Sequence, residues 1–308
     1  MNASARRPRL LLVGGGGGLV GRAVLNEFGI DWEIRSVHRH LAAGEPPLRV
    51  EWTGADVGTL EDWTPLVRDV DLVINLAWYR AGSDRRFSVL ADGLQRLIIA
   101  ARDAEVPRFV HISVPPAPES LESTLPYLVH KRRVDSFLEH SGLSYAIVRP
   151  TMLFGVRDKL LTVMLRTMTR YHRFPIFGDG AYHLSPLAAA DLARILRREG
   201  EIEESRTVLA GGPTRWRYRS LTDEMFERLG LPARYVHFSP RGSVRLARLL
   251  EALGSSLLYA YEVEWLLSDM LGLPPYEGLE TPLAPVEPFL TEEAHRLRGA
   301  RAPVSSYI

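Results

Sequence analysis

The sequence predicts an α/β fold, in which a doubly wound parallel sheet is joined to a smaller mixed C-terminal lobe. Three observations predict it. Short aliphatic runs alternate with helical patterns through the first half of the 308-residue chain. Five consecutive glycines separate the first aliphatic run from the first helical pattern. Runs such as "DLVINLA" and "RFVHIS" have the largely apolar character of strands that are buried on both faces.

The elements of the first half are predicted in chain order from these patterns. The aliphatic runs predict strands at Arg9–Val13, Trp32–Val37, Leu48–Thr53, Leu72–Asn75, Phe109–Ile112 and Tyr145–Val148. Apolar residues at helical spacing predict helices at Leu19–Phe28, Leu60–Val67, Phe87–Ala104 and Tyr127–His140. Pro126 before the last helix and "SG" after it suit a helix start and a helix stop.

The pattern changes after Gly155. An arginine-rich helical stretch is followed by the glycine- and proline-bounded segment "FPIFGDGAYHLSP". We therefore expect a first domain over residues 1–155 and a smaller substrate or partner lobe over residues 156–308. Residues 184–212, which hold the helical "LAAADLARILRRE" and the strand-like "TVLAGG", are predicted to return to the main sheet.

Composition excludes several classes of function. The chain has no cysteine, so disulfides, thiolate zinc sites and cysteine nucleophiles are excluded, and nine scattered histidines predict no metal site. A formal net charge of +1 gives no reason to expect nucleic acid as a partner. No apolar run approaches the roughly 20 residues that cross a bilayer, and the run after the basic leader is too short for a signal peptide. We therefore expect a cytoplasmic protein with no transmembrane segment.

The glycine run, Gly14 to Gly18, is flanked by "LLLV" and "LVGRAVL", whereas a flexible linker has polar flanks. Ordering each glycine costs about 0.5 to 1 kcal/mol relative to alanine, so ordered glycines need a reason. A strand-to-helix turn that brings backbone N–H groups against a pyrophosphate supplies one, and a purely structural turn is the alternative.

Gly21 lies at the offset that a dinucleotide-binding motif requires, three residues after Gly18 and inside the helix. It completes two registers of the motif, which begin at Gly15 and at Gly16. The sequence therefore predicts a Rossmann-type fold with a phosphate cradle. The predicted contacts of this cradle are Gly15, Gly17, Gly18, Leu19, Val20 and Gly21.

The end of the second strand predicts which dinucleotide is bound. About 18 residues after Gly21, where an acidic residue would hold the 2′-hydroxyl of an NAD ribose, stand His38, Arg39 and His40. An arginine suits a 2′-phosphate and no carboxylate lies in this segment, so NADP(H) is preferred and NAD(H) is the alternative. An ordinary surface arginine would give the same pattern in this arginine-rich chain.

The segment "YLVHK" places Tyr127 and Lys131 four residues apart, on one face of a predicted helix. The chain has only two lysines, Lys131 and Lys159, so such a pair rarely arises by chance. An ammonium near a phenol lowers the phenol's pKa from about 10, which lets the hydroxyl exchange a proton with a carbonyl or alcohol. Lys131 can also bond the cofactor ribose. A packed tyrosine beside a solvated lysine is the alternative.

Together, "GGGGGLVG", "YLVHK" and the strand order resemble the short-chain dehydrogenase/reductase superfamily, in its extended or atypical, epimerase/dehydratase-like branch. The resemblance implies further cofactor contacts at Asp56, Val57, Leu76, Ala77, Pro150 and Met152. Within this branch, "RPTMLFGVRDKLL" and "EVEWLLSDMLGLPPYEGLE" are most similar to the nucleotide-binding accessory subunit of respiratory complex I and its bacterial relatives. That subunit keeps a bound NADPH for structure.

Three positions depart from the family pattern. Gly14 stands where a threonine usually opens the glycine motif, and Leu90 stands where an asparagine is expected. The catalytic serine of the family falls at or just after Ser113, and the residues that follow are Val114 and two prolines. Cofactor binding is therefore better supported than catalysis.

The sequence predicts an NADP(H)-dependent oxidoreductase that acts on a carbonyl or alcohol. The resemblance implies that Tyr127 is the acid/base, Lys131 its electrostatic partner and Ser113 a donor to the carbonyl. The alternative is a non-catalytic NADPH-binding subunit, structural or regulatory, of a larger complex. We expect a small-molecule substrate of apolar character, no nucleic acid, and either a partner complex or a homo-oligomer.

Overall fold

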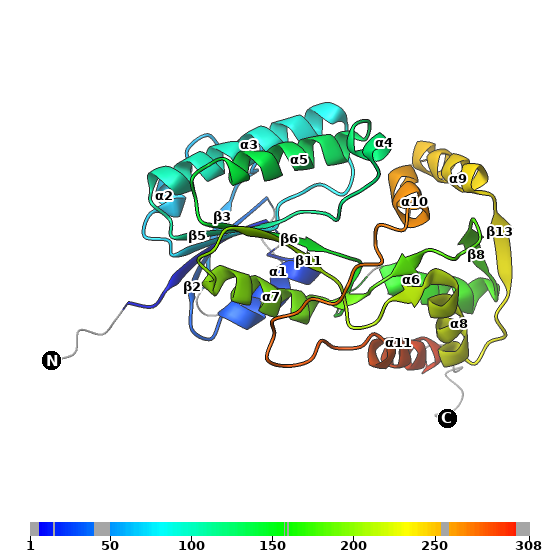
Figure 1. Cartoon of the computed structure of the whole chain (residues 1–308). Helices are drawn as coiled ribbons and strands as arrows, with labels where there is room; N and C mark the ends of the chain where they lie inside the picture. The colour runs from blue at the N-terminus through cyan, green and yellow to red at the C-terminus, as the bar shows by residue number, and fades with distance from the viewer. Residues whose placement is uncertain are drawn as a thin grey trace, which may run out of the picture. The chain divides into compact units, whose positions relative to one another are not determined.

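A computed structural model of the chain describes residues 6–14, 16–39, 50–156, 158, 160–253 and 259–299. These residues form two compact units (Figure 1). Unit 1 comprises Met1–Pro150, Ala189–Ala210 and Tyr276–Pro282, and unit 2 comprises Thr151–Ala188, Gly211–Pro275 and Leu283–Ile308, each as far as it is described.

Unit 1 is built on a seven-stranded parallel sheet with the order β11-β6-β5-β4-β1-β2-β3. Its strands are β1 (Arg9–Val13), β2 (Glu33–His38), β3 (Val50–Gly54), β4 (Leu72–Asn75), β5 (Arg108–Ile112), β6 (Tyr145–Pro150) and β11 (Arg206–Ala210). This arrangement confirms the predicted fold class. The strand order reverses between β1 and β4, so their carboxyl ends diverge and leave room for a ligand there.

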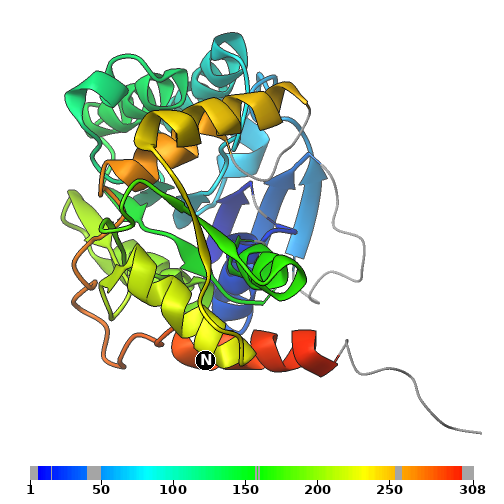
Figure 2. The same cartoon turned by 90° about the vertical axis from the view of Figure 1, so that its right-hand side faces the viewer.

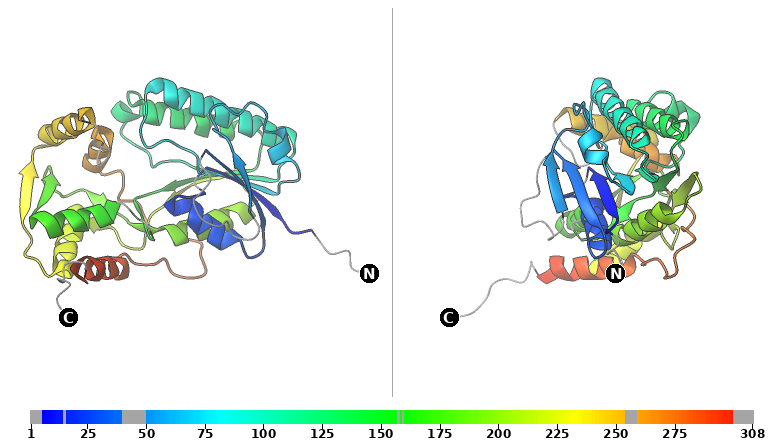
Figure 3. Two further views of the ribbon diagram at one scale, coloured as in Figure 1. Left: turned by 180° about the vertical axis from the view of Figure 1, so that it is seen from behind. Right: turned by 90° about the vertical axis from the view of Figure 1, so that its left-hand side faces the viewer.

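Helices cover both faces of this sheet. In Figures 1 and 3, α1 (Leu19–Phe28) and α7 (Ala189–Glu201) lie on one face, and α3 (Asp84–Asp103) and α5 (Pro126–Glu139) lie on the other. Two short helices, α2 (Thr64–Val67) and α4 (Glu119–Glu122), complete the unit. The buried core between the sheet and α3 and α5 includes Leu11, Val73, Leu94, Leu97 and Val134. The continuous apolar runs of the sequence therefore form strands, as expected for a sheet that helices cover on both faces.

Two helix starts differ from the prediction for local reasons. Helix α3 begins three residues before the predicted Phe87, because the Ser83 hydroxyl caps it by accepting the Arg86 N–H. Helix α2 begins at Thr64 and not at Leu60, with Pro65 in its first turn. Proline suits the first turn of a helix and not its interior. The predicted start of the third strand, Leu48, lies outside the described residues.

Two later segments of the chain join unit 1. Strand β11 pairs in parallel with β6, with Val208 opposite Val148. The segment Tyr276–Pro282 also belongs to this unit, and the Tyr276 hydroxyl donates to the buried Glu199 carboxylate at 2.5 Å. Arg206 pairs with the same carboxylate at 2.6 Å. This second return is not visible in the sequence, because its anchor is a contact between residues 77 positions apart.

Unit 2 combines helices with three two-stranded sheets. The sheets pair β7 (Leu153–Phe154) with β10 (Leu187–Ala188), β8 (Phe174–Phe177) with β13 (Tyr235–Phe238), and β9 (His183–Leu184) with β12 (Trp216–Arg217). The helices are α6 (Leu160–Tyr171), α8 (Tyr218–Leu229), α9 (Pro240–Ala252), α10 (Ala260–Leu267) and α11 (Glu287–Gly299). Figure 2 shows α8 and α11 side by side, and their core residues include Met225 and Leu290. No helix in the described part of the chain is long and apolar enough to span a membrane.

Candidate functional site

Two glycines of the turn after β1, Gly14 and Gly16, have no room for a side chain. Gly14 has a φ of +78°, and a Cβ atom there would lie 2.6 Å from the Cα atom of Ala77. A Cβ on Gly16 would overlap the ring of Trp52. Gly18 is the N-cap of α1 and has no side chain to satisfy the first N–H groups of the helix. These groups are therefore available to an anion, which is what a phosphate cradle requires.

The remaining residues predicted for the cradle lie around this helix start. Gly21 is buried, while Leu19 and Val20 are half-buried in the first turn of α1; Gly15 lies outside the described residues. The carbonyl of Gly17 accepts a hydrogen bond from Arg22 Nε at 3.3 Å. Arg22 therefore adds a positive charge beside the turn. Arg22 was not among the predicted contacts, although it directly follows Gly21.

A pocket of about 240 Å³ lies at the carboxyl ends of β1, β2, β3 and β4, where the strand order reverses. It contains six of the predicted cofactor contacts and several residues that were not predicted. Its lining is Gly14, Val37, His38, Arg39, Ala55, Asp56, Val57, Leu76, Ala77, Trp78, Tyr79 and Leu90. The topology and the lining together make this pocket the candidate nucleotide site.

Tyr79 contacts three charged side chains at the edge of this pocket. The Arg39 and Arg86 guanidinium carbons lie 4.8 Å and 4.2 Å from its ring centroid. Its hydroxyl donates to the Asp56 carboxylate at 3.2 Å, and burial together with the Asp56 charge raises the pKa of Tyr79. Asp56 Oδ2 also lies 4.0 Å from Arg39. The short segment after β2 contains no carboxylate. Asp56, just after the end of β3, nevertheless brings a carboxylate close to Arg39.

Tyr127 and Lys131 lie one turn apart on α5 and share contacts with Trp78. The ring of Tyr127 meets Trp78 edge-on, with the ring centroids 5.8 Å apart. The Lys131 ammonium lies 4.4 Å from the centroid of the Trp78 ring. Lys131 is 2% exposed, and burial lowers its pKa from 10.5 to about 7. The lysine is therefore not a solvated surface residue, which excludes that alternative.

Ser113 belongs to a buried charged network and not to an open surface. Its hydroxyl donates to Asp135 Oδ2 at 2.7 Å. The same oxygen accepts from Arg132 Nη1 at 3.1 Å and from Arg149 Nη2 at 3.2 Å. Burial opposes ionisation of Asp135, but hydrogen bonds from His111 and Ser113 and nearby positive charge hold its pKa well below the usual range. The single hydroxyl proton of Ser113 is thus donated to another side chain of the protein.

His111 connects this network to the end of β4. The Ala77 N–H donates to Asn75 Oδ1 at 3.0 Å, so the Asn75 amide nitrogen faces His111 Nδ1, 2.8 Å away, and donates to it. The ring proton must then sit on His111 Nε2, which lies 3.4 Å from Asp135 Oδ1. Burial and the Lys131 charge lower the pKa of His111 to about 4, so the ring is neutral at pH 7.

The last two predicted contacts, Pro150 and Met152, lie in different units. Pro150 is buried at the end of β6 in unit 1. Met152 is 9% exposed and packs in the core of unit 2 with Phe154 and Leu161. Their roles as cofactor contacts stay predictions.

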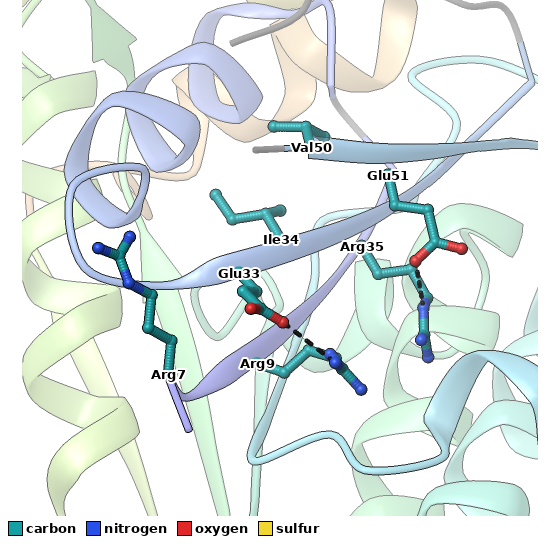
Figure 4. A pocket seen from close by; sticks show the side chains of 7 residues that line it. All are labelled: Arg7, Arg9, Glu33, Ile34, Arg35, Val50 and Glu51. Atoms are coloured by element: carbon teal, nitrogen blue, oxygen red, sulfur yellow. Dashed lines mark hydrogen bonds and ion pairs between the residues drawn. The ribbon is translucent and has the colours of Figure 1, made fainter. Parts of the chain in front are cut away.

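Two other pockets have a different character. At the amino ends of β1 to β3, a pocket of about 490 Å³ contains three arginines and two glutamates (Figure 4). Arg9 pairs with Glu33 at 3.0 Å and Arg35 with Glu51 at 3.2 Å, so ion pairs neutralise two of the three arginines and Arg7 leaves the lining with a formal charge of +1. In unit 2, an open pocket of about 820 Å³ has aromatic and polar lining, including Asp179, Tyr182, His237, Phe238, Ser239 and Asp269. No cluster of side chains suited to a metal ion occurs in the described part of the chain.

Sequence comparison finds a matching family and related proteins, each over about half of the chain. Residues 15–169 match the model of a family described as NAD(P)H-binding. The uncharacterized sugar epimerase YhfK of Bacillus subtilis is 30% identical over 147 residues, which are 44% of this chain and 68% of YhfK. The low-salt glycan biosynthesis protein Agl12 of Haloferax volcanii is 27% identical over 176 residues, which are 47% of this chain and 56% of Agl12.

Solved structures share the fold over nearly the whole chain. A UDP-N-acetylglucosamine 4-epimerase from Methanobrevibacter ruminantium, in complex with UDP-N-acetylmuramic acid, has a TM-score of 0.68 and 16% identity and covers 96% of this chain and 100% of its own. The Escherichia coli NADPH-dependent quinone oxidoreductase QOR2, complexed with NADPH, has a TM-score of 0.69 and 16% identity, with 94% and 99% coverage. At this identity the likeness shows the fold alone.

Proposed function

Because the chain belongs to the NAD(P)H-binding family, in the epimerase/dehydratase-like branch of the short-chain dehydrogenases/reductases, we propose that it is an NADP(H)-dependent oxidoreductase acting on a carbonyl or alcohol. The observation that carries the proposal is the Lys131 ammonium, buried against Trp78 one turn from Tyr127. A positive charge in this position is suited to stabilising a phenolate.

The proposal gives each of these residues a role. The nicotinamide cofactor, when bound, supplies or accepts a hydride. The Tyr127 hydroxyl donates its proton to the carbonyl oxygen during reduction and takes it back during oxidation, while the Lys131 ammonium stabilises the phenolate. The glycine turn and Arg22 would hold the pyrophosphate, and the pocket beside Tyr79 would take the adenosine half.

We propose a preference for NADPH over NADH. Arg39 and Arg86 together carry two positive charges on the Tyr79 ring, against one negative charge on Asp56, which leaves a net charge of +1 for a 2′-phosphate. Arg39→Gln should weaken NADPH binding by about tenfold or more, because a hydrogen bond to a charged group contributes about 1.5 to 3 kcal/mol. NADH binding should stay within about twofold. Calorimetric titration measures both, and Arg102→Gln, on an arginine paired with Asp103, is the control.

The substrate is proposed to be a small molecule that carries polar groups. The open pocket of unit 2 combines Phe238 and Tyr182 with Asp179 and Asp269, so its lining suits both apolar and hydrogen-bonding parts of a ligand. The complexes of similar structures with UDP-linked sugars make a nucleoside-diphosphate sugar the first class to test. The apolar substrate expected from the sequence is the second class, to be tested with quinones and aromatic ketones.

Two observations favour the alternative, a non-catalytic NADPH-binding subunit. The hydroxyl proton of Ser113 is donated to Asp135, and Leu90, where the family pattern has asparagine, lines the nucleotide pocket. The Ser113 proton is therefore already used in a hydrogen bond within the protein, and the asparagine of the family pattern is absent. The resemblance to the complex I accessory subunit is in keeping with this alternative.

The test combines binding and turnover. NADPH should raise the melting temperature, because a ligand that binds the folded state stabilises it. NADPH oxidation, and epimerisation of sugar nucleotides with catalytic NADP⁺, should then be measured over both substrate classes with wild type and Tyr127→Phe. Loss of turnover in the variant with binding retained supports the enzyme. Binding without turnover of any compound supports the alternative, and no thermal shift with NADPH or NADH would refute both.

A further inference from the structure

Helix α5 carries three functional groups at four-residue spacing: Tyr127, Lys131 and Asp135. Residues four apart lie on one face of a helix, so the three share the inner face of α5. Lys131 and Asp135 are each 2% exposed. The proposed proton transfer uses Tyr127 and Lys131 but gives Asp135 no role. A fully buried carboxylate is costly unless several donors and charges surround it, so its presence needs an explanation.

The Asp135 carboxylate is held in one orientation. Its Oδ2 atom accepts from groups on three elements: Ser113 after β5, Arg132 on α5 and Arg149 on β6. Its Oδ1 atom faces His111 on β5. Donors that arrive from three directions prevent the carboxylate from turning away from α5, so its charge stays at a fixed place relative to Lys131.

Among the described residues around Lys131, one side chain supplies a negative charge. Arg132 on α5 and Arg149 on β6 are positive, and His111 on β5 is neutral because burial lowers its pKa. Trp78 offers the face of its ring and no charge. Among the described residues, Asp135 is the carboxylate whose charge raises the pKa of Lys131, against burial and Arg132, which lower it.

We propose that Asp135 is a positioning residue that keeps the Lys131 ammonium charged inside the protein, one turn from Tyr127. Without the carboxylate, burial and Arg132 would favour the neutral amine, which cannot stabilise a phenolate. The role in proton transfer rests on the proposed function, whereas the charge of Lys131 can be measured without cofactor or substrate.

The two lysines of the chain make this measurement direct. Protein grown with [ε-¹³C]lysine gives two lysine signals, from Lys131 and Lys159, and Lys159→Arg assigns them. The ¹³C shift of Lys131 is followed from about pH 5 to about pH 10 to obtain its pKa. Asp135→Asn should lower this pKa by about one unit or more, because it removes a buried opposite charge. Asp135→Glu should restore most of the wild-type value.

Controls separate this charge effect from disturbance of the helix. Asp92→Asn makes the same chemical change in the exposed ion pair that Asp92 of α3 forms with Arg133 of α5. This variant should leave the Lys131 pKa within about 0.3 unit of the wild-type value. If Asp135→Asn alone does not fold, the double variant Asp135→Asn/Arg149→Gln removes a pair of opposite charges and limits the cost of burial. The pKa of Lys131 should fall in the double variant and not in Arg149→Gln.

The results separate this proposal from the proposed function. An unchanged Lys131 pKa in folded Asp135→Asn or in the double variant would overturn the role of Asp135, whatever the turnover. A lowered pKa in a protein that turns over no substrate would support the electrostatic role and count against the oxidoreductase.

Discussion

Replacing Lys131 by methionine should make the folded protein more stable at neutral pH. Methionine keeps an unbranched apolar stem and removes the buried ammonium that lies over the Trp78 ring. Burial lowers the pKa of this ammonium from 10.5 to about 7. A difference of about 3.5 units at about 1.36 kcal/mol per unit corresponds to a cost of about 4 to 5 kcal/mol at pH 7. Relaxation around the site reduces this value, so we expect a gain of at least about 2 kcal/mol.

The pH dependence distinguishes this cause from improved packing. The folded-state pKa of Lys131 is lower than the unfolded-state pKa, so between about pH 7 and 10.5 the unfolded chain binds more protons. The cost is therefore fully present below this window and disappears as the pH rises through it. Urea denaturation of wild type and Lys131→Met measures the gain in the free energy of unfolding at about pH 7 and at about pH 10. Arg133→Met, on an arginine of α5 paired with Asp92, is the control. A variant no more stable than wild type at pH 7, or a gain that persists at pH 10, would refute the reasoning.

Two further predictions concern the nucleotide site and its support. Gly14→Ala should destabilise the protein by at least about 2 kcal/mol and abolish the NADPH-dependent rise in melting temperature, because the new Cβ meets Ala77. Gly142→Ala, at a φ of +84° with open space around it, should cost only about 1 kcal/mol, and equal losses in the two variants would contradict the packing argument. Stability should fall as the pH drops from about 6.5 towards 4, since His111 is neutral when folded and charged when unfolded there. His111→Gln should flatten that part of a urea-midpoint profile, and an unchanged slope would exclude His111 as its cause.

The parallel sheet could be predicted because its strands are buried on both faces. A run such as "DLVINLA" needs no alternation of polar residues, so its pattern is visible without knowledge of its neighbours. The pocket proposed for the nucleotide lies where the sequence led us to expect one, since the carboxyl ends of parallel strands meet at one edge of the sheet. Tyr79 was missed although it stands two residues after Ala77, because its partners Arg39 and Asp56 come from the ends of other strands.

The buried network could not be predicted because its contacts join distant parts of the chain. Ser113 and Asp135 are 22 residues apart and Asn75 and His111 are 36 apart, so no short spacing connects them. One signal was available. Asp135 follows Lys131 at the same four-residue spacing by which Lys131 follows Tyr127, which places all three on one helix face. Whether that face is buried depends on the packing of α5 against the sheet.

The energetic cost of Lys131 bears on the choice between an enzyme and a structural cofactor carrier. A protein that uses NADPH only to stabilise its fold gains nothing from an ammonium whose burial lowers its pKa and so costs stability at pH 7. Such a position is usually filled by an apolar side chain, and Trp78 and Phe87 provide a suitable apolar surface around Tyr127. The chain instead keeps the lysine and places Asp135 one turn further along α5. A destabilising charge is explained when the charge itself is used, as it is in stabilising a phenolate. Lys131→Met should therefore lose turnover and keep part of the NADPH-dependent thermal shift, the rest being lost with the expected bond from Lys131 to the cofactor ribose. A variant with undiminished turnover would remove this argument for catalysis.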